Sequence, residues 1–297
     1  MEQSSETYYV PAQSHWPIIG AVGLFALLGG GGLTLHSVQL QGQASLFSQI
    51  ALYSGAFIMA GMLFGWFATV ISETRKGLYS PQLDISFRFG MSWFIFSEVM
   101  FFFAFFGALY YTRNFSVPWL GGEGDKGVSH MLWPDFSAVW PMLNAPNTEQ
   151  FPPIKDIIDP WHVPLINTII LVSSSVTLTL AHKALKLGNR GKIKMWLGIT
   201  LVLGVSFITL QVTEYIEAYQ QLDLTLASGI YGATFFLLTG FHGLHVTIGS
   251  IILFVLFIRV FKGHFTAEKH FAFEAGAWYW HFVDVVWVLL FILVYLV

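Results

Sequence analysis

The chain has 297 residues, of which 55% are hydrophobic and only 10% are charged, and its formal net charge is −3 at pH 7. Because soluble globular proteins carry about 25% charged residues, this composition excludes an ordinary soluble domain and predicts a polytopic membrane protein. The small negative charge gives no sign of nucleic-acid binding, and the absence of cysteine excludes disulfides and thiolate metal sites. The N-terminal residues lack the basic region and cleavage pattern of a signal peptide, so we expect none.

Seven hydrophobic segments are long enough to cross a bilayer. A helix of about 20 residues spans the hydrocarbon core, which is roughly 30 Å thick. Helices are expected because backbone polar groups in lipid must be satisfied within the segment. Residues 1–297 are therefore predicted to form a single all-α domain of seven transmembrane helices. The predicted ranges are 17–36, 50–72, 86–112, 164–182, 194–216, 228–260 and 271–296.

The basic residues are divided unequally between the two sides of this predicted arrangement. Of the 14 lysines and arginines, 11 fall on one side and three, Arg113, Lys126 and Lys155, fall on the other. The positive-inside rule places the richer side in the cytoplasm. We therefore expect a cytoplasmic N-terminus and a C-terminus outside.

One long polar segment, residues 113–163, lies between the third and fourth spans on the outer side. It is rich in Pro, Trp and Gly and contains six acidic residues against three basic ones. Such a segment is too short and too rich in turn-forming residues for a separate domain. We expect an ordered acidic cap or a docking surface outside the membrane.

Two of the spans carry a glutamate within apolar sequence. Glu98 lies in the phenylalanine-rich segment SEVMFFFAFF of the third span, and Glu214 lies near the outer end of the fifth. Ionisable groups within a bilayer are rare and mark functional sites by default. Both glutamates are therefore candidate proton sites of a transporter; the alternative is a carboxyl group that hydrogen-bonds to a neighbouring helix.

The sixth span contains two histidines in the segment FHGLHV, His242 and His245, which lie on one face. Imidazoles at this spacing could ligate copper, zinc or haem, but they form no complete ligand set. We therefore favour hydrogen bonds to neighbouring helices and predict no metal in this chain. The opposite face carries small residues that would let another helix approach closely. These small residues are Gly229, Gly232, Gly240, Gly243, Thr247 and Ser250.

The seventh span, FEAGAWYWHFVDVVW and the apolar residues after it, carries Glu274, His281 and Asp284 within an arc of about 80°. Trp280 and Trp287 point to a different face, towards lipid or a neighbouring helix. The polar arc suits either interhelical hydrogen bonds or a proton relay, and we favour the former because one helix shows no continuous chain. A metal or haem enzyme that also uses His281 stays open at this point.

Four long motifs, in the same order, resemble subunit III of the aa3-type cytochrome c oxidases. They are SEVMFFFAFF, DPWHVPLINT, TGFHGLHVTIGS and HFAFEAGAWYWHFVDVVW. The resemblance implies a seven-helix bundle with a V-shaped, phospholipid-filled cleft between helices 1–2 and helices 3–7. It also implies a subunit of a proton-pumping respiratory oxidase that packs directly against subunit I, in a complex with subunit II and small subunits. Haem a and copper are then expected in the partner subunits, with only structural phospholipids bound to this chain.

The resemblance further implies that the chain has no catalytic residue of its own. It would support complex integrity, lipid binding, oxygen access and proton uptake for subunit I. A subunit III-like protein of a quinol oxidase or nitric oxide reductase, or a proton-coupled transporter, is the alternative. The expected buried ionisable or structural residues are Glu98, Glu214, His242, His245, Glu274, His281 and Asp284. The expected lipid-binding residues are Trp66, Arg259 and His264.

Two features depart from the family pattern. Trp66 is followed by FATVISE where the family usually shows R-D-x-x-x-E, and Leu78 and Tyr79 replace an expected histidine pair. These changes weaken the expectation of headgroup contacts from this loop. The outer segment is longer than the mitochondrial pattern, which favours a bacterial plasma membrane over the mitochondrial inner membrane.

Overall fold

The computed structural model describes residues 13–297, and within this range the chain is helical without any strand. Seven of its helices are long and apolar enough to cross a membrane, which confirms the predicted seven-helix transmembrane fold. Residues 1–12 lie outside the described range, so the prediction that the N-terminal residues form no signal peptide is not tested. By their internal contacts, Met1–Phe87 and Arg88–Val297 form two compact units.

The first unit contains two helices, α1 (Trp16–Gln41) and α2 (Leu46–Arg75), which extend the predicted spans 17–36 and 50–72 at both ends. Gly42 ends α1 with a φ of 71°, a left-handed conformation that glycine adopts without strain. Ser45 then begins α2, because its side chain accepts a hydrogen bond from the Ser48 backbone N–H. A short turn therefore brings the two helices together.

Helices α1 and α2 meet through their backbones at two glycines. A Cβ atom at Gly30 would lie 2.3 Å from the Leu52 nitrogen, and one at Gly55 would lie 2.2 Å from the Leu27 nitrogen. Neither position has room for a side chain, so glycine is required for this contact. The outward faces remain apolar, with the side chains of Phe25 and Phe57 82% and 81% exposed.

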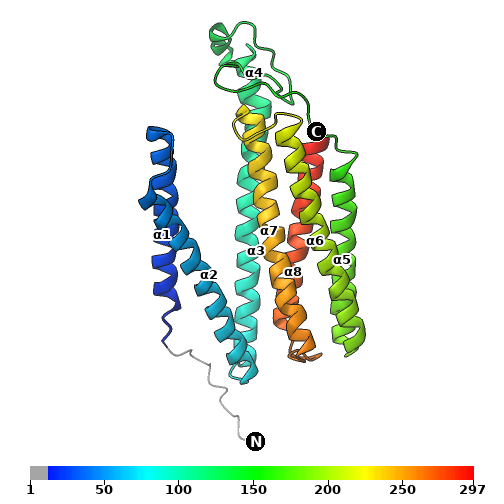
Figure 1. The fold of residues 1–297 in the computed structure, drawn as a ribbon. Helices are drawn as coiled ribbons and strands as arrows, with labels where there is room; N and C mark the ends of the chain where they lie inside the picture. Colours follow the sequence, from blue (N-terminus) through cyan, green and yellow to red (C-terminus); the bar gives the residue numbers. More distant parts are fainter. Residues whose placement is uncertain (1–12) are drawn as a thin grey trace, which may run out of the picture. The chain divides into compact units, whose positions relative to one another are not determined.

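The second unit contains the remaining helices, which Figure 1 shows running roughly alongside one another. Helix α3 continues through a π-helical turn and α4 as far as Leu120, beyond the predicted end at residue 112. The α-helices are α3 (Pro81–Tyr111), α4 (Val117–Leu120), α5 (Val163–Lys186), α6 (Arg190–Gln220), α7 (Gly229–Phe261) and α8 (Phe271–Leu290). The shorter turns are η1 (Thr112–Ser116), η2 (Gly127–Leu132) and η3 (Phe291–Leu296).

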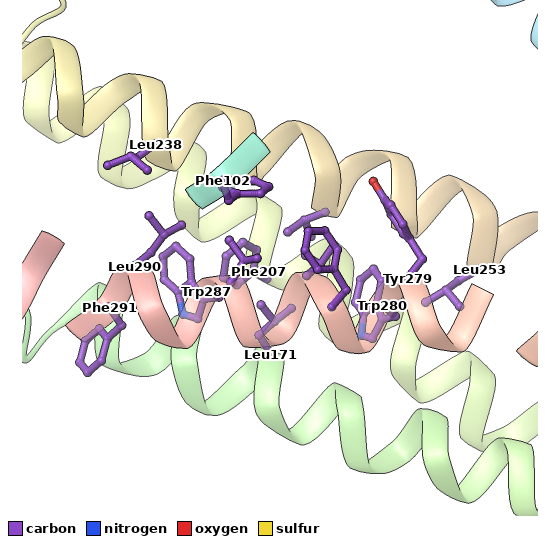
Figure 2. Packing of buried hydrophobic residues seen from close by; sticks show 14 of the residues in the cluster. Phe102, Leu171, Phe207, Leu238, Leu253, Tyr279, Trp280, Trp287, Leu290 and Phe291 are labelled. Atoms are coloured by element: carbon purple, nitrogen blue, oxygen red, sulfur yellow. The ribbon is translucent and has the colours of Figure 1, made fainter. Parts of the chain in front are cut away.

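The core of this unit surrounds α8 and two of its three tryptophans, Trp280 and Trp287, which are fully buried (Figure 2). The Trp280 ring fits against Gly204 of α6 and Gly249 of α7, where an added Cβ would lie 2.8 Å and 2.9 Å from it. Its indole N–H donates to the Ser174 hydroxyl of α5 at 2.8 Å. The tryptophans therefore face neighbouring helices, one of the two directions expected.

The predicted stripe of small residues on α7 makes few close contacts. Gly243 has no surrounding atom within 4 Å of an added Cβ, and Gly240 has only the Tyr215 hydroxyl at 3.8 Å. Closer approaches lie towards its ends: a Cβ at Gly232 would overlap the Thr225 carbonyl oxygen, and one at Gly204 of α6 would lie 3.2 Å from the Ser250 hydroxyl. Within the described residues, the centre of the stripe is therefore left open, and close approach of another helix there stays a prediction.

We predict that Gly30→Leu separates α1 from α2, because the new side chain would overlap the Leu52 backbone, which cannot move aside. Since the chain has no cysteine, spin labels at Phe25→Cys and Phe57→Cys can report the distance between the helices. The distance should increase in Gly30→Leu. It should not change in the control Gly32→Leu, where an added Cβ meets nothing within 4 Å; equal distances in both variants would contradict the contact.

Candidate functional site

The Glu98 carboxyl group of α3 pairs with His245 of α7. Its Oε2 atom lies 2.9 Å from His245 Nε2, and the other ring nitrogen, Nδ1, lies 2.6 Å from the Phe241 carbonyl oxygen. A carbonyl only accepts, so Nδ1 carries a proton. Two ionisable groups on different helices thus serve as each other's partner in apolar surroundings.

Glu274, near the start of α8, is held by Arg88 of α3. Arg88 Nη1 lies 2.8 Å from Glu274 Oε2, and the guanidinium lies 5.0 Å above the Phe271 ring. Sequence reasoning missed this pair because the residues are 186 positions apart. The available signal was that Arg88 and Glu274 lie near the ends of their spans that are predicted to be on the same side of the membrane.

His242 contacts a different helix from His245. Its Nε2 atom donates to the Val283 carbonyl oxygen of α8 at 3.2 Å, and its ring packs 5.1 Å from Trp287 and 5.7 Å from Phe207. The two histidines on one turn of α7 therefore face two partners, Glu98 on α3 and the backbone of α8. They do not converge on a common point.

His281 of α8 interacts with the hydroxyl groups of α5. Its Nδ1 lies 2.6 Å from Ser175 Oγ and its Nε2 lies 3.5 Å from Thr179 Oγ1. Asp284 Oδ2 is 3.8 Å from the same Nδ1, which is too far for a hydrogen bond. Glu274 therefore pairs with α3, whereas His281 and Asp284 lie beside each other and face α5.

Glu214 of α6 belongs to a buried polar network at the end of the unit that carries the C-terminus. Its Oε1 atom accepts the Tyr295 hydroxyl at 2.6 Å and the Gln211 amide at 3.0 Å. Gln211 in turn accepts the Asn167 amide at 3.5 Å. The network joins α5, α6 and η3. Tyr295 was not singled out in the sequence, because an aromatic hydroxyl near the end of an apolar helix gives no distinctive signal.

The expected lipid-binding residues lie in both units. Trp66 of α2, in the first unit, is exposed and stacks on Phe67 with 5.5 Å between ring centroids. Arg259 of α7, in the second, is buried, and its guanidinium lies 4.4 Å above the Phe265 ring. The His264 backbone N–H donates to the Arg259 carbonyl at 3.0 Å, which places these two residues together at the end of α7.

The ionisable groups therefore form separate links between helices. Across residues 13–297, no three His, Asp or Glu side chains come together in an arrangement that could hold a metal ion. The pairs connect α3 to α7, α3 to α8, α7 to α8 and α5 to α8. What this arrangement can do chemically is fix neighbouring helices in one register, because the paired polar groups reach across from one helix to the next.

Comparison with known proteins identifies the family. The family model for cytochrome c oxidase subunit III matches residues 6–125 and 129–297. Cytochrome c oxidase subunit 3 of Formosania lacustris is 38% identical over 297 residues, covering 99% of this chain and 98% of the relative. That of Mammuthus primigenius is 41% identical over 300 residues, with the same two coverages. These relatives are a fish and a mammalian protein, which counts against the predicted bacterial source. The chain belongs to the cytochrome c oxidase subunit III family.

Proposed function

We propose that this chain is a non-redox subunit of a proton-pumping terminal oxidase that keeps the catalytic subunit intact. Its membership of a haem-copper oxidase complex with other subunits follows from the family. In the proposal it packs directly against subunit I, which holds haem a and copper, and supports lipid binding, oxygen access and proton uptake. The observation that best supports this role is that Glu98, His242 and Glu274 each pair with a neighbouring helix.

The physical argument rests on how these groups are used. A catalytic acid or relay residue must exchange its proton with a substrate or a further group. Here the Glu98 carboxyl faces His245, and His245 faces the backbone of its own helix. A pair closed in this way suits structural support better than proton transfer over a long distance. Redox chemistry is accordingly assigned to the partner subunits.

The proposal includes the orientation and the lipids. The distribution of basic residues supports an N-terminus on the basic-rich side of the membrane and a C-terminus on the opposite side. We assign structural phospholipids to this chain, with headgroups near Trp66 of the first unit and near Arg259 and His264 of the second. Two cationic or ionisable side chains together at the end of α7 suit an anionic headgroup.

Optical spectroscopy of the purified complex tests the proposed role. Haem a absorbance should accompany this chain when it is isolated with its partners and should be absent from the chain once it is stripped away. Turnover of the depleted complex should fall during prolonged assay, since the support role concerns integrity. Stoichiometric haem or copper in the isolated chain would overturn the proposal.

We predict that Glu98→Gln preserves assembly and most turnover. Glutamine has the same length and can still donate a hydrogen bond to His245 Nε2, which replaces the contact now at 2.9 Å. Glu98→Leu should instead lower the free energy of unfolding by about 1–3 kcal/mol, because it leaves a desolvated ring nitrogen without a partner. Thermal unfolding and oxygen consumption of both variant complexes provide the measurement.

A complete loss of proton pumping in Glu98→Gln, with normal assembly, would contradict the structural role and place Glu98 on an essential relay. Tyr215→Phe serves as a control for removing a polar contact away from this pair. Its hydroxyl donates to Thr239 at 2.7 Å, so any effect on stability should not extend to pumping.

A further inference from the structure

The segment between α3 and α5 folds into a cap (residues 113–162) that is tied to the outer end of its own unit. The Lys155 backbone N–H donates to the Leu222 carbonyl at 2.9 Å, and the Lys155 ammonium lies 2.8 Å from Asp223. Trp140 packs edge-on against Tyr231 of α7, with 5.4 Å between centroids. Because these contacts anchor it, the cap presents a defined surface.

The first part of the cap folds back on α4. The Ser129 hydroxyl donates to the Trp119 carbonyl at 3.0 Å, and His130 Nδ1 lies 3.1 Å from the Leu120 carbonyl. These bonds attach one face of η2 (Gly127–Leu132) to α4. Residues three apart in a 3₁₀ helix share a face, so Val128 and Met131 point the same way.

That face is apolar and uncovered. Val128, Met131 and Leu132 are 72%, 80% and 71% exposed, and Val139 is 59% exposed. We call these four residues the cap patch. Leu132 and Val139 also line a cleft of about 700 Å³ formed by residues 132–148, with the buried Met142 in its wall. Exposed apolar residues beside a cleft are typical of an interaction surface.

The cap patch lies too far from the bilayer centre for lipid chains to cover it. Arg88 and Glu274 are at one level because they are paired. At 1.5 Å per residue, Leu120 lies about 48 Å beyond Arg88 along its helix, whereas Leu296 lies about 33 Å beyond Glu274. The helical column ending in α4 thus projects past the end of α8, and Figure 1 shows the cap above the outer ends of α6 and α7.

The surroundings of the cap patch are acidic. Glu123, Asp125, Asp135 and Glu149 are exposed, and the ion pairs found among residues 13–297 include none of them. The backbone N–H of Trp161 lowers the pKa of Asp159 below its usual value, so this carboxyl group also stays charged at neutral pH.

The three basic residues of the cap offset this charge only in part. Lys155 is paired with Asp223, the Lys126 ammonium lies 4.6 Å above the Trp119 ring, and Arg113 lies in η1 at the start of the cap. The surface around the cap patch therefore presents negative charge to a partner.

We infer that the cap patch is the docking surface for an extramembrane domain of another subunit of the oxidase, one that presents apolar side chains ringed by lysine and arginine. An apolar centre with a charged rim matches the usual anatomy of a protein interface. The acidic rim would repel both anionic lipid headgroups and a second copy of this chain. A partner rich in lysine and arginine would pair with the acidic side chains around the cap patch and bury the apolar side chains of the patch itself.

Cysteine labelling in the intact complex tests this inference, because the chain has no cysteine of its own. Met131→Cys is compared with Gln150→Cys, an exposed polar position of the same cap. Membranes are treated with a water-soluble maleimide, and the label is read by mass on the peptides of this chain. Position 131 should be protected in the assembled complex and position 150 should react.

A photocrosslinker attached at position 131 then identifies what covers the patch. A crosslink to an extramembrane segment of another oxidase subunit supports the inference. Rapid maleimide labelling at both positions, or a crosslink only to lipid or to a second copy of this chain, overturns it.

A charge substitution gives an independent readout. Met131→Asp places a carboxylate in the centre of the contact and should weaken retention of the partner about thirtyfold, the effect of losing a central apolar contact. Gln150→Asp adds the same charge away from the patch and should retain the partner. Equal subunit composition of the two variant complexes on native electrophoresis would overturn the inference.

Discussion

The packing of α8 against α5, α6 and α7 depends on one contact, the fit of the Trp280 ring between Gly204 and Gly249 with its N–H on Ser174. Lipid is as apolar as a helix surface, so the hydrophobic effect gives little drive for helices to associate within a bilayer. Dispersion contacts and hydrogen bonds must supply it instead. A large flat ring in a space that only glycine leaves open provides many such contacts at once. Trp287 packs instead against the rings of Phe207 and His242 and donates its indole N–H to the Thr168 hydroxyl.

The buried ionisable groups depend on this packing for their partners. Because α8 is held close to α5 and α7, His242 reaches the Val283 carbonyl and His281 reaches Ser175. Helix α3 is joined to the same group through Glu98 and Arg88. Such pairs add little net stability, since desolvation offsets most of the attraction. Their effect is on specificity: a helix that slipped by one turn would leave charged atoms unpartnered in lipid, which costs far more than the pair contributes.

The first unit follows a different rule from the second. Helices α1 and α2 touch through glycine backbones and bury almost no large side chain, whereas the second unit buries aromatic rings throughout. A chain with both kinds of surface suits a subunit that must contact lipid and protein partners together. The cap adds a third surface, acidic and apolar, outside the depth that lipid chains can reach.

Much of this protein could be predicted from its sequence. The number of membrane-spanning helices follows from hydropathy, because only a helix of about 20 apolar residues satisfies its backbone across the bilayer. The shared arc of Glu274, His281 and Asp284 follows from helical spacing, and four motifs led to the family. Spacing along one helix says nothing of the neighbouring helix, however. The Arg88–Glu274 pair, the Tyr295 bond to Glu214 and the fit of Trp280 against Gly249 were decided only by the tertiary structure. The reason is physical: a polar group in lipid takes whichever partner the packed helices bring within about 3 Å, and that position depends on the whole bundle.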